Sequence, residues 1–228
     1  MFDQKKKDIV SEKIQNIGKS PLDILLVGPT GVGKSSTINA LINANYAKVG
    51  YTPNPETMEI ACYTWENCMR LWDSPGLGDG KLDQAHKEKI RCLLRESYTY
   101  NGRRYGKIDF VLVIIDISSR DIGASTDLLN DVIIPEMSEN RVIIAFNRCD
   151  FAMSGRHWEK SAPDEILLKE INKRDTIISE RINRDCNLKI PKKPICYSAQ
   201  YYYNTDILFE KLVNTIPNYK RKFMRVTK

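Results

Sequence analysis

The chain has 228 residues, of which 42% are hydrophobic and 28% are charged, and it carries a formal net charge of +6 at pH 7. This length and apolar content are enough to build one domain with a sizeable core. A net charge of this size does not by itself indicate a nucleic-acid-binding protein.

The six cysteines include no Cys-x-x-Cys pair, and the two histidines are not placed to form a zinc site. We therefore expect reduced thiols. The longest apolar run, residues 110–115, is too short to span a bilayer, and no apolar stretch follows the lysines near the N-terminus. These features predict a cytoplasmic protein without a transmembrane segment.

Residues 1–20 predict a short amphipathic helix. Its apolar residues recur at helical spacing among lysines and glutamates, at Val10, Ile14 and Ile17. We expect this helix to pack on the rest of the domain. A contact with a partner or a membrane surface is the alternative.

A glycine-rich segment at residues 28–35 fits the phosphate-loop pattern of Gly, four residues, Gly, Lys and Ser/Thr. A buried strand is predicted before it and a helix after it. In that order, backbone N–H groups and the helix N-terminus converge on one small volume, which suits phosphates. We expect Lys34 to reach the outer phosphates and Ser35 to bind Mg²⁺. The nucleotide-binding residues expected here are Gly28, Thr30, Gly31, Val32, Gly33, Lys34, Ser35 and Ser36.

Residues 45–56 contain two prolines and predict a loop, which is followed by strands at 57–64 and 68–72 with a turn between them. Thr57 stands where the loop ends and the first strand begins. We expect its hydroxyl to complete the coordination of Mg²⁺ when a triphosphate is bound. Thr52 is the alternative.

The sequence Asp73-Ser74-Pro75-Gly76 follows the second of these strands directly. This position would put a carboxylate beside the magnesium ion and the N–H of Gly76 near the terminal phosphate. An ordinary turn is the alternative interpretation. The expected metal ligands are thus Ser35, Thr57 and Asp73, and the expected catalytic residues are Lys34, Thr57 and Gly76.

The remaining chain alternates helices with strands. Helices are expected at residues 83–98, at 127–137 with a bend or an end at Pro135, after a capping sequence at 161–164, and at 205–216; strands are expected at 108–115, 141–146 and 195–197. The order predicts an α/β fold: about six strands in a mostly parallel sheet, one antiparallel edge strand, and helices on both faces. Ligands of such sheets bind at the carboxyl ends of the strands.

Asn147-Arg148-Cys149-Asp150 closes the strand at 141–146. A carboxylate at Asp150 can accept hydrogen bonds from N1–H and the 2-amino group of guanine, whereas adenine offers no such pair of donors. Ser198-Ala199, after the last strand, would supply a backbone N–H to the guanine oxygen. The expected base-binding residues are Asn147, Arg148, Asp150, Ser198 and Ala199, so an ATPase or a kinase with this phosphate loop is disfavoured.

In their order, these five segments resemble the motifs of P-loop GTPases of the translation-factor-related class, and the string at residues 33–41 resembles the Era-like branch. Further residues resemble the bacterial YfjP/YeeP-type GTPases, which are described by homology as ribosome-binding: Ser119-Arg120-Asp121, Thr126-Asp127, Asn147 to Asp150, Trp158 and Pro163. The resemblance covers roughly residues 20–217. It implies a GTP-binding G domain at 21–217, with GTP/GDP and Mg²⁺ as ligands, between the helix at 1–20 and a basic tail at 218–228.

Three positions depart from the motifs of the family. Arg148 stands where a lysine usually lies over the guanine plane, although a guanidinium can stack there too. Leu77 stands where many small GTPases carry the glutamine that orients water. Gly31 stands where potassium-activated relatives carry asparagine, so potassium dependence is not supported.

We therefore expect a GTP-hydrolysing conformational switch that is slow without a partner. A GTP-binding scaffold or dimerisation module with negligible turnover is the alternative. It is favoured by Leu77, which stands in place of a water-orienting glutamine. The expected partners are guanine nucleotide, the ribosome or RNA through basic surface, and a second copy of the chain bound in a nucleotide-dependent manner. The tail at 220–228 is interpreted as a solvated end, with a contact to ribosomal RNA or acidic lipid as the alternative.

Overall fold

The structure is a computed structural model that describes residues 2–42, 48–49, 60–78, 83–186 and 193–223. A seven-stranded sheet forms its centre, in the order β11-β8-β7-β1-β4-β3-β2. The parallel strands are β1 (Leu22–Val27), β4 (Met69–Asp73), β7 (Phe110–Asp116), β8 (Val142–Asn147) and β11 (Ile195–Cys196). The fold class predicted from the sequence is thus confirmed.

The antiparallel side of the sheet has one strand more than predicted. β3 (Ala61–Trp65) runs antiparallel to β4, and β2 (Lys48–Val49) pairs outside β3. The predicted edge strand is therefore not the edge, and residues 48–49 belong to a strand rather than to the predicted loop. Three residues, 66–68, lie between β3 and β4; two of them, Glu66 and Asn67, have positive φ (48° and 54°), and the N–H of Cys68 donates to the carbonyl of Trp65 to close the turn.

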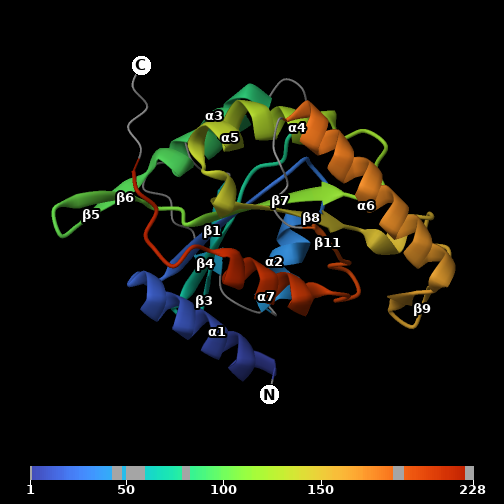
Figure 1. Cartoon of the computed structure of the whole chain (residues 1–228), viewed down its shortest axis with the longest axis horizontal. Helices are drawn as coiled ribbons and strands as arrows, with labels where there is room; N and C mark the ends of the chain where they lie inside the picture. Colours follow the sequence, from blue (N-terminus) through green and yellow to red (C-terminus); the bar gives the residue numbers. More distant parts are fainter. Residues whose placement is uncertain (1, 43–47, 50–59, 79–82, 187–192, 224–228) are drawn as a thin grey trace.

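Helices cover both faces of the sheet (Figure 1). One face carries α3 (Asp83–Arg95), α4 (Gly123–Leu128), α5 (Ile134–Glu136) and α6 (Glu165–Asp185); the other carries α1 (Phe2–Ile17), α2 (Lys34–Ile42) and α7 (Thr205–Thr215). Side chains alternate between the faces along a strand. In β1, Leu25 and Val27 accordingly pack in the core under α3 and α6, while Ile24 and Leu26 pack in the core under α2 and α7.

The helix predicted at 127–137 is divided into three pieces. A π-helical segment (Leu129–Ile133) separates α4 from α5, which ends at Glu136. Pro135 has no N–H to donate to the preceding turn, so the prediction of a bend or an end there is confirmed. The predicted cap of α6 is confirmed as well, since the Asp164 carboxylate accepts a hydrogen bond from the N–H of Leu167 across 2.9 Å.

Two hairpins were not predicted. α3 ends at Arg95 rather than at Tyr98, because β5 (Ser97–Tyr100) turns back and pairs with β6 (Arg103–Gly106). The second hairpin joins β9 (Trp158–Glu159) to β10 (Ala162–Pro163). Two 3₁₀ turns, Glu139–Arg141 and Cys149–Phe151, flank β8.

α1 lies on the domain, against α7. Its buried residues Val10 and Ile17 join the core, and the Lys13 ammonium donates to the carbonyl of Ile216 across 2.7 Å. None of the described helices has the length and apolarity that a membrane crossing requires.

The described part of the basic tail is not a solvated end, which corrects the sequence-based interpretation. The N–H of Gly106 donates to the carbonyl of Arg221 across 2.8 Å, and the N–H of Phe223 donates to the carbonyl of Arg104. Residues 221–223 therefore extend the β5–β6 hairpin along β6. The division of the chain at residues 20 and 217 remains a prediction.

Candidate functional site

The phosphate-loop sequence joins β1 to α2 and needs its glycines. Gly28, Gly31 and Gly33 have φ of +153°, +78° and +91°, which side chains disfavour. A Cβ atom on Gly28 would lie 2.3 Å from the carbonyl oxygen of Ile114, and one on Gly33 would lie 2.4 Å from Nδ2 of Asn147. The loop is thus closely packed against β7 and against the segment that follows β8.

Lys34 begins α2 and turns back into the loop. Its ammonium donates to the carbonyl oxygens of Gly28 (3.1 Å) and Pro29 (3.0 Å), and only 8% of the residue is exposed. Burial lowers the pKa of Lys34, while the charge of Asp73 acts in the opposite direction. The site therefore holds a largely desolvated cation inside the curve of the loop.

Ser35 and Asp73 meet at the carboxyl end of β4. The Ser35 hydroxyl donates to Oδ2 of Asp73 across 2.5 Å. A hydroxyl and one carboxylate, together with phosphate oxygens, are a donor set that suits Mg²⁺, which is usually held by one or two carboxylates plus substrate phosphates and water. The described residues contain no cluster of three or more His, Cys, Asp or Glu that could hold a metal ion by itself. Thr57 and the alternative Thr52 lie outside the described residues.

The segment after Asp73 lies across the phosphate loop. The N–H of Thr30 donates to the carbonyl of Leu77 across 2.7 Å, and a Cβ atom on Gly76 would lie 2.4 Å from Oγ1 of Thr30. Nδ1 of His86, in α3, lies 2.7 Å from the carbonyl oxygen of Gly76. Only glycine allows this close approach, which places Gly76 directly beside the loop.

The side chain of Leu77 belongs to the hydrophobic core, and 1% of the residue is exposed. It packs with core residues of the α3 face and cannot reach a water molecule above the loop. The expectation that Leu77 has no part in orienting water thus has a structural reason.

Asn147, at the end of β8, joins three segments. Its amide Nδ2 donates to the carbonyl of Val32 (2.8 Å), and its Oδ1 accepts from the N–H of Ala199 (3.0 Å). The side chain is buried. The sequence predicted that Asn147 binds the base; in the structure its side chain joins the end of β8 to the phosphate loop and to the loop after β11.

Asp150 has a buried oxygen that lacks a donor. Arg148 adopts a left-handed conformation (φ 64°), and the following 3₁₀ turn carries Asp150. Oδ1 of Asp150 is buried and has no hydrogen-bond partner among the described residues. Leaving such an oxygen unsatisfied is costly, and N–H groups such as those at the edge of guanine would satisfy it.

Ser198-Ala199 was predicted to supply a backbone N–H to the guanine oxygen, and the N–H groups of both residues already donate within the chain. Ser198 N–H donates to the carbonyl of Tyr203 (3.1 Å), and Ala199 N–H donates to Asn147. Ser198 thus closes the turn before α7 rather than pointing its N–H to the predicted base site. In this structure neither residue offers the expected donor.

The side chain of Arg148 is held by Asp116, which sequence reasoning missed. Nη1 of Arg148 donates to Oδ2 of Asp116 across 2.8 Å. Asp116 ends β7, and a cavity of about 170 Å³ lies between this pair and residues 29–32 of the phosphate loop. A sequence signal for this pair existed: Asp116 is a carboxylate at the carboxyl end of the strand next to β8. The carboxyl ends of parallel strands lie at one edge of the sheet, so polar residues there come close together.

A central strand, a glycine-rich phosphate loop and the helix that follows it define the class of P-loop nucleotide-binding proteins. Residues 23–148 match the sequence pattern described as 50S ribosome-binding GTPase, and the chain belongs to that family. The prediction of a GTPase of the translation-factor-related class is thereby confirmed.

The curated relatives carry the name EngB. The chain is 27% identical over 202 residues to the probable GTP-binding protein EngB of Mycoplasmoides gallisepticum, covering 88% of this chain and 92% of that protein. It is 34% identical over 131 residues to the EngB of Malacoplasma penetrans, covering 56% and 63%.

Solved structures show the same fold. Toc33 from Arabidopsis thaliana, in complex with GDP and Mg²⁺, superposes with a TM-score of 0.65 at 16% identity, covering 94% of this chain and 92% of that one. A probable GTP-binding protein EngB superposes with a TM-score of 0.56 at 17% identity, covering 85% and 98%.

Proposed function

We propose that the chain is an EngB-like switch that binds GTP between the phosphate loop and Asp150 and hydrolyses it to GDP and phosphate. The observation that carries this proposal is the hydrogen bonding of Asn147, which ties the phosphate loop to the segment that bears Asp150. These hydrogen bonds would hold the two ends of the proposed nucleotide site in one unit. The relatives named EngB favour this branch over the YfjP/YeeP-type proteins.

The phosphates would lie in the curve of residues 28–35, with the Lys34 ammonium exchanging its two backbone carbonyls for phosphate oxygens. A partly desolvated ammonium attracts an anion more strongly than a hydrated one does. Ser35 and Asp73 would hold Mg²⁺, with Thr57 as the proposed third ligand. The metal ion would neutralise charge on the outer phosphates.

Gly76 is proposed to sense the terminal phosphate, because it already lies against Thr30 of the loop. A phosphate there would compete with the hydrogen bond from Thr30 N–H to the carbonyl of Leu77. Binding of GTP would then displace residues 76–77, and His86 would carry that movement into α3. This exchange of contacts is the proposed switch.

Catalysis would rest on Lys34, Mg²⁺ and backbone N–H groups, because Leu77 is buried in the core. A missing arginine finger typically costs about 10³–10⁵ in rate. A catalytic group equivalent to the arginine finger would therefore come from a partner or from a second copy of the chain bound across the nucleotide. A GTP-binding scaffold with negligible turnover is the second candidate, and the burial of Leu77 favours it.

Contact with the ribosome is proposed from the family and from one basic surface. The β5–β6 hairpin exposes Arg103 and Arg104, and Tyr100 beside them is 48% exposed. Cations and aromatic rings on one exposed ribbon suit RNA phosphates and bases. This contact, and a cytoplasmic location, are proposals for the present chain.

The test is single-turnover hydrolysis of GTP with and without Mg²⁺, over a range of protein concentrations. We expect slow, magnesium-dependent turnover that rises with concentration or with added ribosomal subunits. Lys34→Ala should abolish it with an unchanged circular dichroism spectrum, and Lys169→Ala, on the exposed side of α6, is the matched control. Tight GTP binding without measurable turnover under all of these conditions would favour the scaffold, and no GTP binding would refute both.

A further inference from the structure

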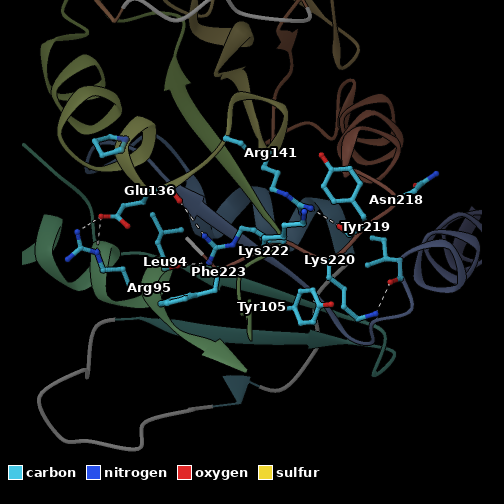
Figure 2. A pocket seen from close by; sticks show the side chains of 14 residues that line it. Leu94, Arg95, Tyr105, Glu136, Arg141, Asn218, Tyr219, Lys220, Lys222 and Phe223 are labelled. Atoms are coloured by element: carbon cyan, nitrogen blue, oxygen red, sulfur yellow. Dashed lines mark hydrogen bonds and ion pairs between the residues drawn. The ribbon is translucent and has the colours of Figure 1, made fainter. Parts of the chain in front are cut away.

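A cavity of about 810 Å³ lies away from the nucleotide site, at the amino ends of the strands. Its wall is built from the end of α3, α5, β6 and the C-terminal segment, and includes Leu94, Glu136, Tyr105 and Tyr219 (Figure 2). Arg141, also in the wall, directly precedes β8, so the length of that strand, about 20 Å, separates it from Asn147. The volume is in the range of small-molecule sites.

Most of the charged residues in this wall are basic. Of the residues that line the cavity, five are basic and one is acidic; the basic ones are Arg95, Arg141, Lys220, Arg221 and Lys222. The single acid, Glu136, is already paired, because Arg95 donates to it through Nε (2.8 Å) and Nη2 (2.5 Å). Figure 2 shows this pair at one end of the cavity. The rest of the wall is positive.

Two of these cations, the buried Arg141 and the half-buried Arg221, have no carboxylate ion-pair partner among the described residues. Arg141, with 2% of the residue exposed, donates to the carbonyls of Asp109 (2.9 Å) and Tyr219 (2.6 Å). Arg221 donates to the carbonyls of Leu94 and Glu136. Burial, and then the nearby charge of Arg141, lower the pKa of Arg221 to about 10. The charges of Asp109 and Glu136 oppose the lowering of the pKa, but desolvation dominates, so the two guanidinium groups carry a cost that a bound anion would reduce.

Anchoring of the C-terminal segment explains the two guanidinium groups and part of the role of Lys220, but not Lys222. Lys220 donates only to the carbonyl of Ile17 (3.1 Å) and lies over the rings of Tyr100 and Tyr105. No hydrogen bond or ion pair joins Lys222 to another described residue, and its side chain is exposed. Lys222 therefore adds charge to the cavity without a side-chain partner among the described residues, whereas Lys220 adds charge and also anchors the C-terminal segment.

We propose that this cavity binds a small phosphate ester. Guanidinium and ammonium groups together suit a phosphate dianion, which offers more acceptor oxygens than a carboxylate does. Tyr105, Leu94 and Phe223 supply an apolar wall for the organic part of the ligand. The concave shape favours a small molecule over a long polyanion.

The test is isothermal titration calorimetry of the full chain with ribose 5-phosphate, inorganic phosphate and ribose. The protein is first saturated with GDP and Mg²⁺, so that a phosphate cannot register at residues 28–35. A repeat without GDP shows whether the two sites are independent. We expect saturable binding of ribose 5-phosphate, weaker binding of inorganic phosphate, and none of ribose.

Lys222→Glu reverses one exposed charge at the cavity and should weaken the binding of ribose 5-phosphate by about tenfold or more. Lys222→Arg should retain binding, and Lys169→Glu, on α6, is the matched control with the same change in net charge. No saturable binding to the GDP-loaded protein, or equal binding by Lys222→Glu, would overturn the proposal. Salt-dependent binding of a single-stranded RNA that Lys222→Glu weakens, without binding of the ester, would instead make this face an RNA surface. The outcome does not depend on GTP hydrolysis, so it can fail while the proposed GTPase stands.

Discussion

The amide of Asn147 donates to the carbonyl of Val32 across 2.8 Å, which makes the end of β8 a support for the phosphate loop. The same side chain accepts from the N–H of Ala199. A single buried amide thus satisfies one acceptor and one donor that water does not reach. The stability of the domain and its affinity for nucleotide are therefore coupled at this residue.

We predict that Asn147→Ala weakens both properties. Leaving the carbonyl of Val32 and the N–H of Ala199 unpaired should cost about 1–3 kcal/mol. For a chain of this size that corresponds to a fall in Tm of about 2–12 °C. Thermal denaturation and titration with a fluorescent GDP analogue measure the two effects, and Asn172→Ala, at an exposed position of α6, is the control. Normal Tm and normal affinity in Asn147→Ala would mean that these contacts contribute nothing.

Substituting two glycines of the phosphate loop should have different effects on stability. Both Gly31 and Gly33 have positive φ, so alanine at either position should cost about 1–2 kcal/mol in backbone strain. At Gly33 the new Cβ would also lie 2.4 Å from Nδ2 of Asn147, whereas at Gly31 nothing lies within 4 Å. We predict that Gly33→Ala loses more stability and more GDP affinity than Gly31→Ala. Equal losses, measured by urea denaturation and GDP titration, would show that strain alone decides.

Much of the fold could be predicted because its signals are local. The apolar runs gave β1, β7 and β8, and the capping sequence at Asp164 gave the start of α6. The β5–β6 hairpin was missed, although Asn101-Gly102 at its turn, with φ of 48° and 71°, is a known hairpin signal. Helical periodicity through Tyr98 masked it. The strand at 48–49 is two residues long and depends on pairing with β3, which no local pattern reveals.

Guanine selectivity is predicted to depend on Asp150. Its buried Oδ1 lacks a donor among the described residues, so removing the acceptor should leave the donors of guanine unpaired. The expected cost is about 1–3 kcal/mol or more. Asp150→Asn should therefore bind GDP much more weakly, and xanthine nucleotides, which exchange the 2-amino donor for an oxygen, should restore part of the affinity. Competition titrations with GDP, XDP and ADP measure the preference; an unchanged preference for GDP would remove Asp150 from the base site.

The cap of α6 should give the protein a pH-dependent component of stability. The hydrogen bond from Leu167 N–H, and then the contact with His157, lower the pKa of Asp164. Because the folded pKa lies below the unfolded value of about 3.9, this stabilisation is present above that pH and is lost as pH falls through the folded pKa. We predict that Tm of Asp164→Ala lies below that of the wild type from neutral pH down to about 4, and that the difference narrows at lower pH.

The control for this cap is Asp164→Asn, which keeps a side-chain oxygen for the N–H of Leu167 but does not titrate. Its Tm should lie close to that of the wild type at neutral pH and should change less on acidification. A difference between wild type and Asp164→Ala that stays constant down to pH about 2 would show that the carboxylate charge is not involved.

The parts of the site that the sequence did not reveal depend on distant contacts. Arg148 is held by Asp116, 32 residues away, and the basic tail packs against β6 rather than into solvent. Composition predicted a solvated end for that tail because lysines and arginines are usually exposed. Arg221 is an exception, since it is anchored by carbonyl groups of Leu94 and Glu136 that only the folded chain brings together.

Introducing glutamine at position 77 is an obvious way to try to raise the slow rate of GTP hydrolysis, but we expect it to fail in this fold. Leu77 occupies the position at which many small GTPases carry glutamine, so Leu77→Gln restores the familiar sequence. In this fold, however, 1% of Leu77 is exposed and its side chain packs in the core of the α3 face, while its carbonyl accepts from Thr30. A glutamine there would bury an amide among apolar side chains and lose their packing, at a cost of about 2–5 kcal/mol. We therefore predict that Leu77→Gln has a lower Tm and no faster single-turnover GTP hydrolysis than the wild type. Leu77→Met is the control, because it preserves side-chain volume and should keep the wild-type rate.

A stable Leu77→Gln protein that hydrolyses GTP faster than the wild type would contradict this prediction. It would show that the side chain at position 77 reaches the nucleotide, and that residues 76–77 take up a different position when GTP is bound.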